Sequence, residues 1–115
     1  MNKIIVNKLA KMAMTESAGL ELRKEIENFI KTEERIVIDF TGISLFATMF
    51  FNASIGHFVM ILSPEKCKKL FDLVNLTELG METYEHSFEN AETMYYHKNE
   101  QSVIGEITQN NIEHS

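Results

Sequence analysis

Three short runs of strand-forming residues divide the chain, at residues 4–6, 36–40 and 70–74. After each run, apolar residues recur at the spacing of an amphipathic helix. The second run reads Ile-Val-Ile-Asp-Phe, and its apolar residues point to both sides of a strand. This pattern is typical of a parallel strand that is covered on both faces. The repeated strand–helix order predicts an α/β sandwich with a mostly parallel sheet and helices packed on it.

The helices are expected at residues 18–30, at residues 48–62 and from residue 78 onward. The second should end before Pro64, because proline cannot donate a backbone hydrogen bond and disfavours helix in the residue before it. Each helix has a hydroxyl residue at its start that can serve as the N-cap: Ser17, Thr48 and Thr77.

A chain of 115 residues is long enough to bury one hydrophobic core. Residues 1–98 are expected to form a single α/β domain. Residues 99–115 are mostly polar, and we expect a tail there that is disordered or adds a short strand at residues 103–108. The single cysteine excludes an intrachain disulfide.

The net charge of −6 is unevenly distributed along the chain. Residues 1–31 carry a net +2, whereas residues 32–115 carry −8. An acidic balance argues against broad nucleic-acid binding, which needs clustered cations. Five glutamates of the last helix are spaced 4, 3, 4, 3 and form an acidic stripe, which is either a solvated face or a docking surface for a basic partner: Glu78, Glu82, Glu85, Glu89 and Glu92.

The first residues contain no apolar run long enough for a signal peptide or a membrane span. The protein is therefore expected to be cytoplasmic, without membrane contact.

The residue pattern contains no established catalytic or metal-binding motif. The four histidines lack the spacing of a shared metal site, and the five glycines form no nucleotide-binding loop, so we expect neither metal nor cofactor. Cys67 lies among three lysines, which would lower a thiol pKa, but no histidine–acid arrangement accompanies it.

Asp39 lies at the carboxyl end of the predicted central strand, and such ends border the ligand crevice in open α/β sheets. It is either a ligand or base at that crevice, or it bonds backbone N–H groups of the next loop. A small-ligand site or an enzyme that uses Asp39 with Cys67 or His57 in a cleft is the alternative to a binding module.

Three stretches together resemble a STAS-like domain family of unknown function: AGLELRKEIENFI, IVIDFTGISLFATMFFNASIG and LFDLVNLTELGMETYEHSFENAETMYY. The resemblance covers about residues 15–96 and rests mainly on Asp-Phe-Thr-Gly-Ile at residues 39–43 and its spacing to Phe50. This family is similar to the STAS domains of bacterial anti-sigma-factor antagonists and of sulfate transporters. The resemblance implies an α/β sandwich that acts as a non-enzymatic protein-binding module.

In the antagonists, a serine at the start of the helix after the central strand is phosphorylated by a histidine-kinase-like ATPase partner. Their Asp-Ser-Ser-Gly sequence corresponds here to Ala-Thr-Met-Phe at residues 47–50, so Met49 takes the phosphoacceptor position and Thr48 keeps a hydroxyl. The resemblance implies that Thr48 is the candidate phosphoacceptor. It also implies a partner-binding surface at the start of this helix: Ser44, Thr48, Met49 and Asn52.

Leu9, Met12 and Met14 form a second apolar cluster. Methionine is adaptable and recurs at binding surfaces, so this segment either closes one end of the core or mediates self-association.

Overall fold

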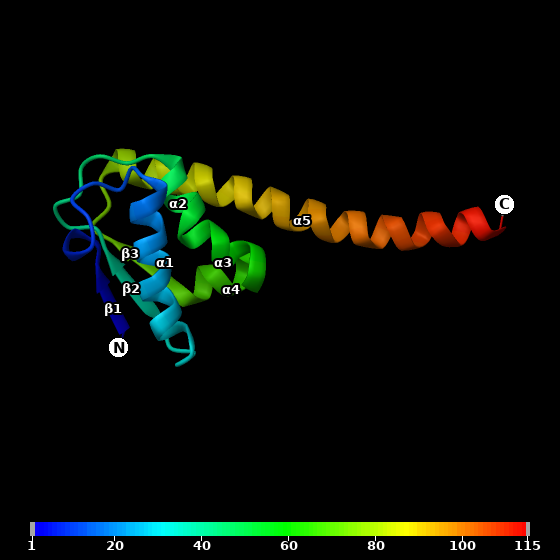
Figure 1. Ribbon diagram of the computed structural model, residues 1–115, viewed down its shortest axis with the longest axis horizontal. Coiled ribbons are helices and arrows are strands. Elements are labelled where there is room, and N and C mark those ends of the chain that lie inside the picture. Colours follow the sequence, from blue (N-terminus) through cyan, green and yellow to red (C-terminus); the bar gives the residue numbers. More distant parts are fainter. Residues whose placement is uncertain (1, 115) are drawn as a thin grey trace.

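A three-stranded parallel sheet forms one layer of the protein (Figure 1). The computed structural model describes the backbone of residues 2–114 and the side chains of residues 2–99. The strand order is β1-β2-β3, in chain order, so β2 is central. The strands are β1 (Asn2–Ile5), β2 (Ile36–Asp39) and β3 (Phe71–Val74). The predicted α/β fold with a parallel sheet is confirmed.

Within residues 2–114, five α-helices and one short 3₁₀ helix connect and cover the strands. The 3₁₀ helix spans Val6–Lys8 directly after β1. The α-helices are α1 (Glu16–Ile30), α2 (Thr48–Ala53), α3 (Ile55–Leu62), α4 (Pro64–Leu70) and α5 (Glu78–His114).

Two of the three predicted N-cap residues are not the caps in the structure. The hydroxyl of Thr15, not Ser17, accepts a hydrogen bond from the Ala18 N–H at 3.0 Å, and α1 therefore begins two residues early. Ala47 is the N-cap of α2, so the prediction of Thr48 as a cap is wrong. Thr77 is confirmed, since its hydroxyl accepts from the Gly80 N–H at 3.0 Å.

The predicted second helix is broken at Ser54, whose backbone leaves the helical region (φ −104°, ψ −93°). The buried Ser54 hydroxyl donates to the Phe50 carbonyl at 2.8 Å. Such a bond to the preceding turn competes with the regular helical ladder. Pro64 ends this region as predicted, but it also starts α4, because a first-turn position does not need its missing N–H.

The core lies between the sheet and the helices and is rich in phenylalanine. Phe40 lies after β2 and contacts the rings of Phe50 and Phe51 in α2, with centroids 6.4 and 5.8 Å away. All three rings are fully buried. Gly19 lets α1 approach this helix, because a Cβ there would lie 2.5 Å from the Phe50 carbonyl oxygen.

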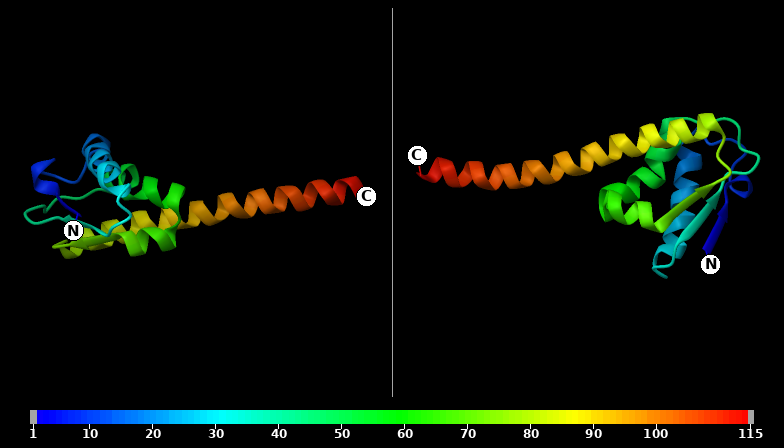
Figure 2. Two further views of the ribbon diagram at one scale, coloured as in Figure 1. Left: turned by 90° about the horizontal axis from the view of Figure 1, so that it is seen from below. Right: turned by 180° about the vertical axis from the view of Figure 1, so that it is seen from behind.

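Only one face of the sheet is covered in the described part of the chain. Ile4, Ile36 and Ile38 belong to the buried core, whereas Val37 and Val74 are half-buried and lie outside it. Figure 2 shows the helices gathered on one side of the strands. The expectation that β2 is covered on both faces is therefore wrong, since all the crossover helices pack on the same side.

The expected tail is the continuation of α5, which runs to His114 and projects away from the rest of the molecule (Figure 1). The structure has helix where a short strand was expected at residues 103–108. No proline interrupts the backbone ladder after Glu78, and the one glycine beyond residue 98, at position 105, costs only about 1 kcal/mol in a helix. Residue 98 accordingly marks no break in the helix.

Candidate interaction surface

Asp39 fixes the loop that leads from β2 to α2. Its Oδ1 accepts hydrogen bonds from the N–H and the hydroxyl of Thr41, at 2.9 and 2.7 Å, and from Nδ2 of Asn75 at 3.0 Å. Lys3 Nζ lies 3.5 Å from Oδ2. The hydrogen bonds from Asn75 and Thr41 hold the pKa of Asp39 well below its usual range. Of the two roles expected for Asp39, the structure shows the second: its carboxylate fixes the next loop by hydrogen bonds.

A parallel bridge between Ala13 and Phe46 holds this loop against the segment before α1. The Ala13 N–H donates to the Leu45 carbonyl, and the Ala47 N–H donates to the Ala13 carbonyl, both at 2.9 Å. Because alternate residues of an extended chain point to opposite sides, the buried Ala13 places Met12 and Met14 outward.

The start of α2 continues this exposed apolar region. Met49 is 53% exposed, Met12 49% and Leu45 48%. Met49 and Asn52 line a hollow of about 340 Å³ together with Glu16 and Ala53. We call the exposed residues on this side the α2 surface: Met12, Met14, Leu45, Met49 and Asn52.

Of the four predicted partner-binding residues, two line the hollow and two do not. Met49 and Asn52 converge, and Asn52 is held by the Ser87 hydroxyl, which donates to its Oδ1 at 2.5 Å. Ser44 is exposed in the loop, and Thr48 is half-buried in the first turn of α2. Neither of them lines the hollow.

Sequence reasoning missed two contributors to this region, Leu45 and Glu16. Leu45 stands next to Phe46, and nothing in the local pattern says which of the two faces the core. Glu16 joins the hollow because α1 packs directly on α2.

A groove of about 690 Å³ continues from the hollow between α1, the α2–α3 pair and α5. Glu16, Asn52 and Ala53 line both. His57 faces this groove, and burial, followed by the nearby Arg23, lowers its pKa.

Asp39, Cys67 and His57 do not converge. Cys67 is 1% exposed in α4, and burial raises its pKa to about 12, so it is an inert thiol. Since α4 leads into the amino end of β3, Cys67 lies at the opposite end of the sheet from Asp39, which pairs with Val74 at the carboxyl end. The groove that His57 lines includes neither Asp39 nor Cys67. The structure therefore does not bring these side chains together in one cleft.

The described side chains contain no group of three or more His, Cys, Asp or Glu residues that could hold a metal ion. Among the helices described, none is both long and apolar enough to cross a membrane.

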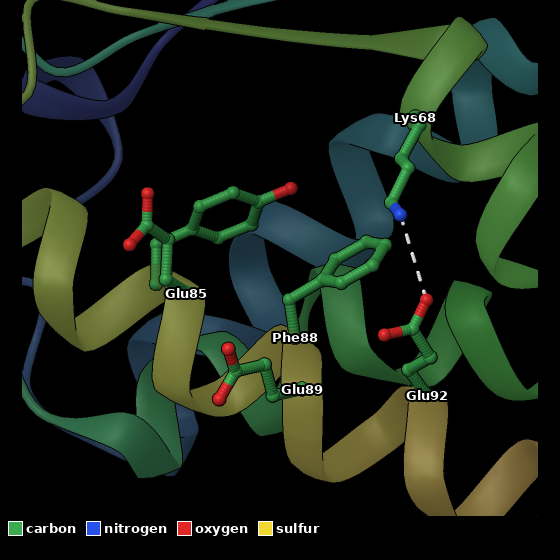
Figure 3. A pocket seen from close by; sticks show the side chains of 6 residues that line it. Lys68, Glu85, Phe88, Glu89 and Glu92 are labelled. Carbon is green, nitrogen blue, oxygen red and sulfur yellow. Dashed lines mark hydrogen bonds and ion pairs between the residues drawn. The ribbon is translucent and has the colours of Figure 1, made fainter.

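The acidic stripe of α5 borders a second hollow, of about 280 Å³, shown in Figure 3. Tyr84 and Phe88 line it together with Glu85, Glu89 and Glu92. Lys68 of α4 reaches into it, with Nζ 3.5 Å from Glu92 Oε2 and 5.5 Å from the Phe88 ring centroid. The stripe is therefore partly neutralised within the molecule.

The family model for the STAS-like domain of unknown function (DUF4325) matches residues 18–81. This match covers more than half of the chain. The protein belongs to this family. The matched segment runs from α1 into the first turn of α5 and includes the loop between β2 and α2. Neither a search of curated proteins nor a search of solved structures found a match.

Proposed function

We propose that this STAS-like protein is a non-enzymatic regulatory module that binds a protein partner through the α2 surface. The observation that carries the proposal is the exposure of four large apolar side chains around the start of α2: Met12, Met14, Leu45 and Met49. Contiguous exposed apolar residues are typical of protein-interaction sites.

The backbone under this surface is held in place, which favours binding. Asp39 fixes one end of the loop, and the bridge between Ala13 and Phe46 fixes its middle. A preorganised surface loses less conformational entropy when a partner binds. The methionine side chains remain adaptable and can fit an irregular partner.

The partner class that the STAS resemblance implies is a histidine-kinase-like ATPase. Met49 occupies the position of the phosphorylated serine in the antagonists, so a direct equivalent of that switch is absent. The hydroxyl of Thr48 lies one residue away, and we include its phosphorylation as a second part of the proposal. Intact-mass measurement of the protein from its native host should detect a phosphate that is lost in Thr48→Ala.

The experiment compares Met49→Arg with Ile61→Arg as bait in a lysate of the native host. Both residues are exposed apolar side chains, but Ile61 lies near the end of α3. The proposal predicts that wild type and Ile61→Arg retain the same partner and that Met49→Arg loses it. Retention of every specific partner by Met49→Arg would reject the α2 surface.

A further inference from the structure

The face of the sheet that the helices leave uncovered carries an ordered pattern of charge. We call it the open face, and its side chains are Lys3, Ile5, Arg35, Val37, Asp39, Asp72 and Val74. The ion pairs Lys3–Asp39 (3.5 Å) and Arg35–Asp72 (3.6 Å) place these four residues on the same side. We propose that the open face is an interface between two copies of this chain.

The strand register arranges the open face in rows. Lys3 is level with Val37 of β2, and Val37 is level with Asp72 of β3. This row therefore has a cation at one edge of the sheet, an apolar residue at the centre and an anion at the other edge. The next row toward the carboxyl end contains Ile5, Asp39 and Val74.

This pattern is complementary to itself. A two-fold axis parallel to the strands, midway between two facing sheets, places β1 of one copy over β3 of the other. Lys3 then faces Asp72 of the second copy, twice by symmetry, and Val37 faces its own counterpart. Facing sheets pack about 10 Å apart, which long charged side chains can span. An axis across the strands through the same row would instead place like charges opposite each other.

Asp39 lies on the proposed axis, but its charge is already satisfied. It has three hydrogen bonds from Thr41 and Asn75 and the ion pair with Lys3, and its side chain is only 11% exposed. The two cations and two anions of the open face also cancel, so the two facing surfaces carry no net charge, although each chain as a whole carries −6. The central apolar residue of the other row, Val37, is free to pack against its symmetry mate.

The size of the open face makes the dimer weak. Three strands about 4.8 Å apart and four residues at about 3.3 Å each cover roughly 200 Å². Stable complexes bury about 800 Å² per partner, which is several times the area of the open face. We therefore expect dissociation in the upper micromolar to millimolar range, with further weakening by salt, because the cross-copy ion pairs are exposed at the edges of the sheet.

Sedimentation equilibrium of the full chain, from roughly 10 µM to 1 mM, measures this association directly. Wild type should form dimers in this range. Lys3→Glu and Asp72→Lys should each weaken the dimer about tenfold or more, since each places like charges opposite one another twice. A mixture of the two variants should associate again, because the introduced glutamate of one copy then faces the introduced lysine of the other.

Val37→Glu provides a variant that leaves both ion pairs intact and places two carboxylates at the axis. Circular dichroism confirms that each variant is folded. A monomer at every concentration would overturn the proposal, and so would a dimer that Val37→Glu leaves unchanged or a mixture that does not re-associate. A dimer lost in Met49→Arg but kept in Val37→Glu would instead place self-association on the α2 surface.

Discussion

Replacing Asp39 by alanine tests how strongly one carboxylate holds the loop beneath the α2 surface. The substitution removes the acceptor for three hydrogen bonds, from two groups of Thr41 and from Asn75, together with the ion pair to Lys3. A hydrogen bond to a charged group contributes about 1.5–3 kcal/mol. Thr41 and Asn75 are exposed and regain water, so we expect a total loss of about 3 kcal/mol.

For a domain of this size, this loss lowers the melting temperature by about 10–20 °C. Asp39→Asn keeps one oxygen acceptor but no charge, and should lose less. Thermal and urea unfolding followed by circular dichroism measure both variants. A change of less than about 0.5 kcal/mol in Asp39→Ala would refute the role of this carboxylate.

The pH dependence of stability gives an independent test of the same group. The pKa of Asp39 in the folded protein lies well below its usual range, mainly because of the hydrogen bonds from Asn75 and Thr41. Its stabilisation is therefore complete above the unfolded pKa of about 3.9 and is lost as the pH falls below that value. The difference in unfolding free energy between wild type and Asp39→Asn should shrink between about pH 5 and pH 2. A difference that stays constant over this window would contradict the assignment.

Three further predictions follow from buried or capping groups. Gly19→Ala should destabilise the protein by about 1–3 kcal/mol in urea unfolding, because its Cβ would lie 2.5 Å from the Phe50 carbonyl oxygen; an unchanged stability would show that α1 can move away. Cys67 should react with a thiol reagent at pH 8 only after unfolding, since it is buried and its pKa is raised to about 12, and rapid reaction of the native protein would disprove this burial. Thr15→Ala should cost about 1 kcal/mol and Thr48→Ala less than about 0.5 kcal/mol, because the Thr15 hydroxyl caps α1 whereas Thr48 caps no helix; equal losses would contradict the observed caps.

The strands and the parallel sheet were predictable because their signals are local. Runs of β-branched residues predicted β1 and β2, the run Leu-Phe-Asp-Leu-Val at residues 70–74 predicted β3, and the strand–helix order predicted their parallel arrangement. The break at Ser54 was not predictable, since a serine inside an amphipathic segment is ordinarily compatible with a continuous helix. Its hydroxyl donates to the Phe50 carbonyl, and both residues are buried in the core.

The open face could not be read from the sequence for a similar reason. Val37 and Asp39 alternate with buried isoleucines in a run that reads as apolar on both sides. Which face is covered depends on the side to which all the crossover helices pack. No residue of β2 itself encodes that choice.

The candidate surface was predictable in part. The family resemblance pointed to Met49 and Asn52, and the structure brings these two together at one hollow. The contribution of Glu16 depends on the close packing of α1 on α2, which Gly19 permits. Thr48 was expected to cap its helix, but the extended backbone of Ala47 takes that position.

The central claim is that the protein binds its partner through the α2 surface. Titration of the partner captured from the native host, with purified wild type, Met49→Arg and Ile61→Arg, tests it most directly. We predict that Met49→Arg weakens binding at least tenfold, a loss of about 1.4 kcal/mol, while Ile61→Arg binds as wild type does. Equal affinities of all three proteins would contradict the claim.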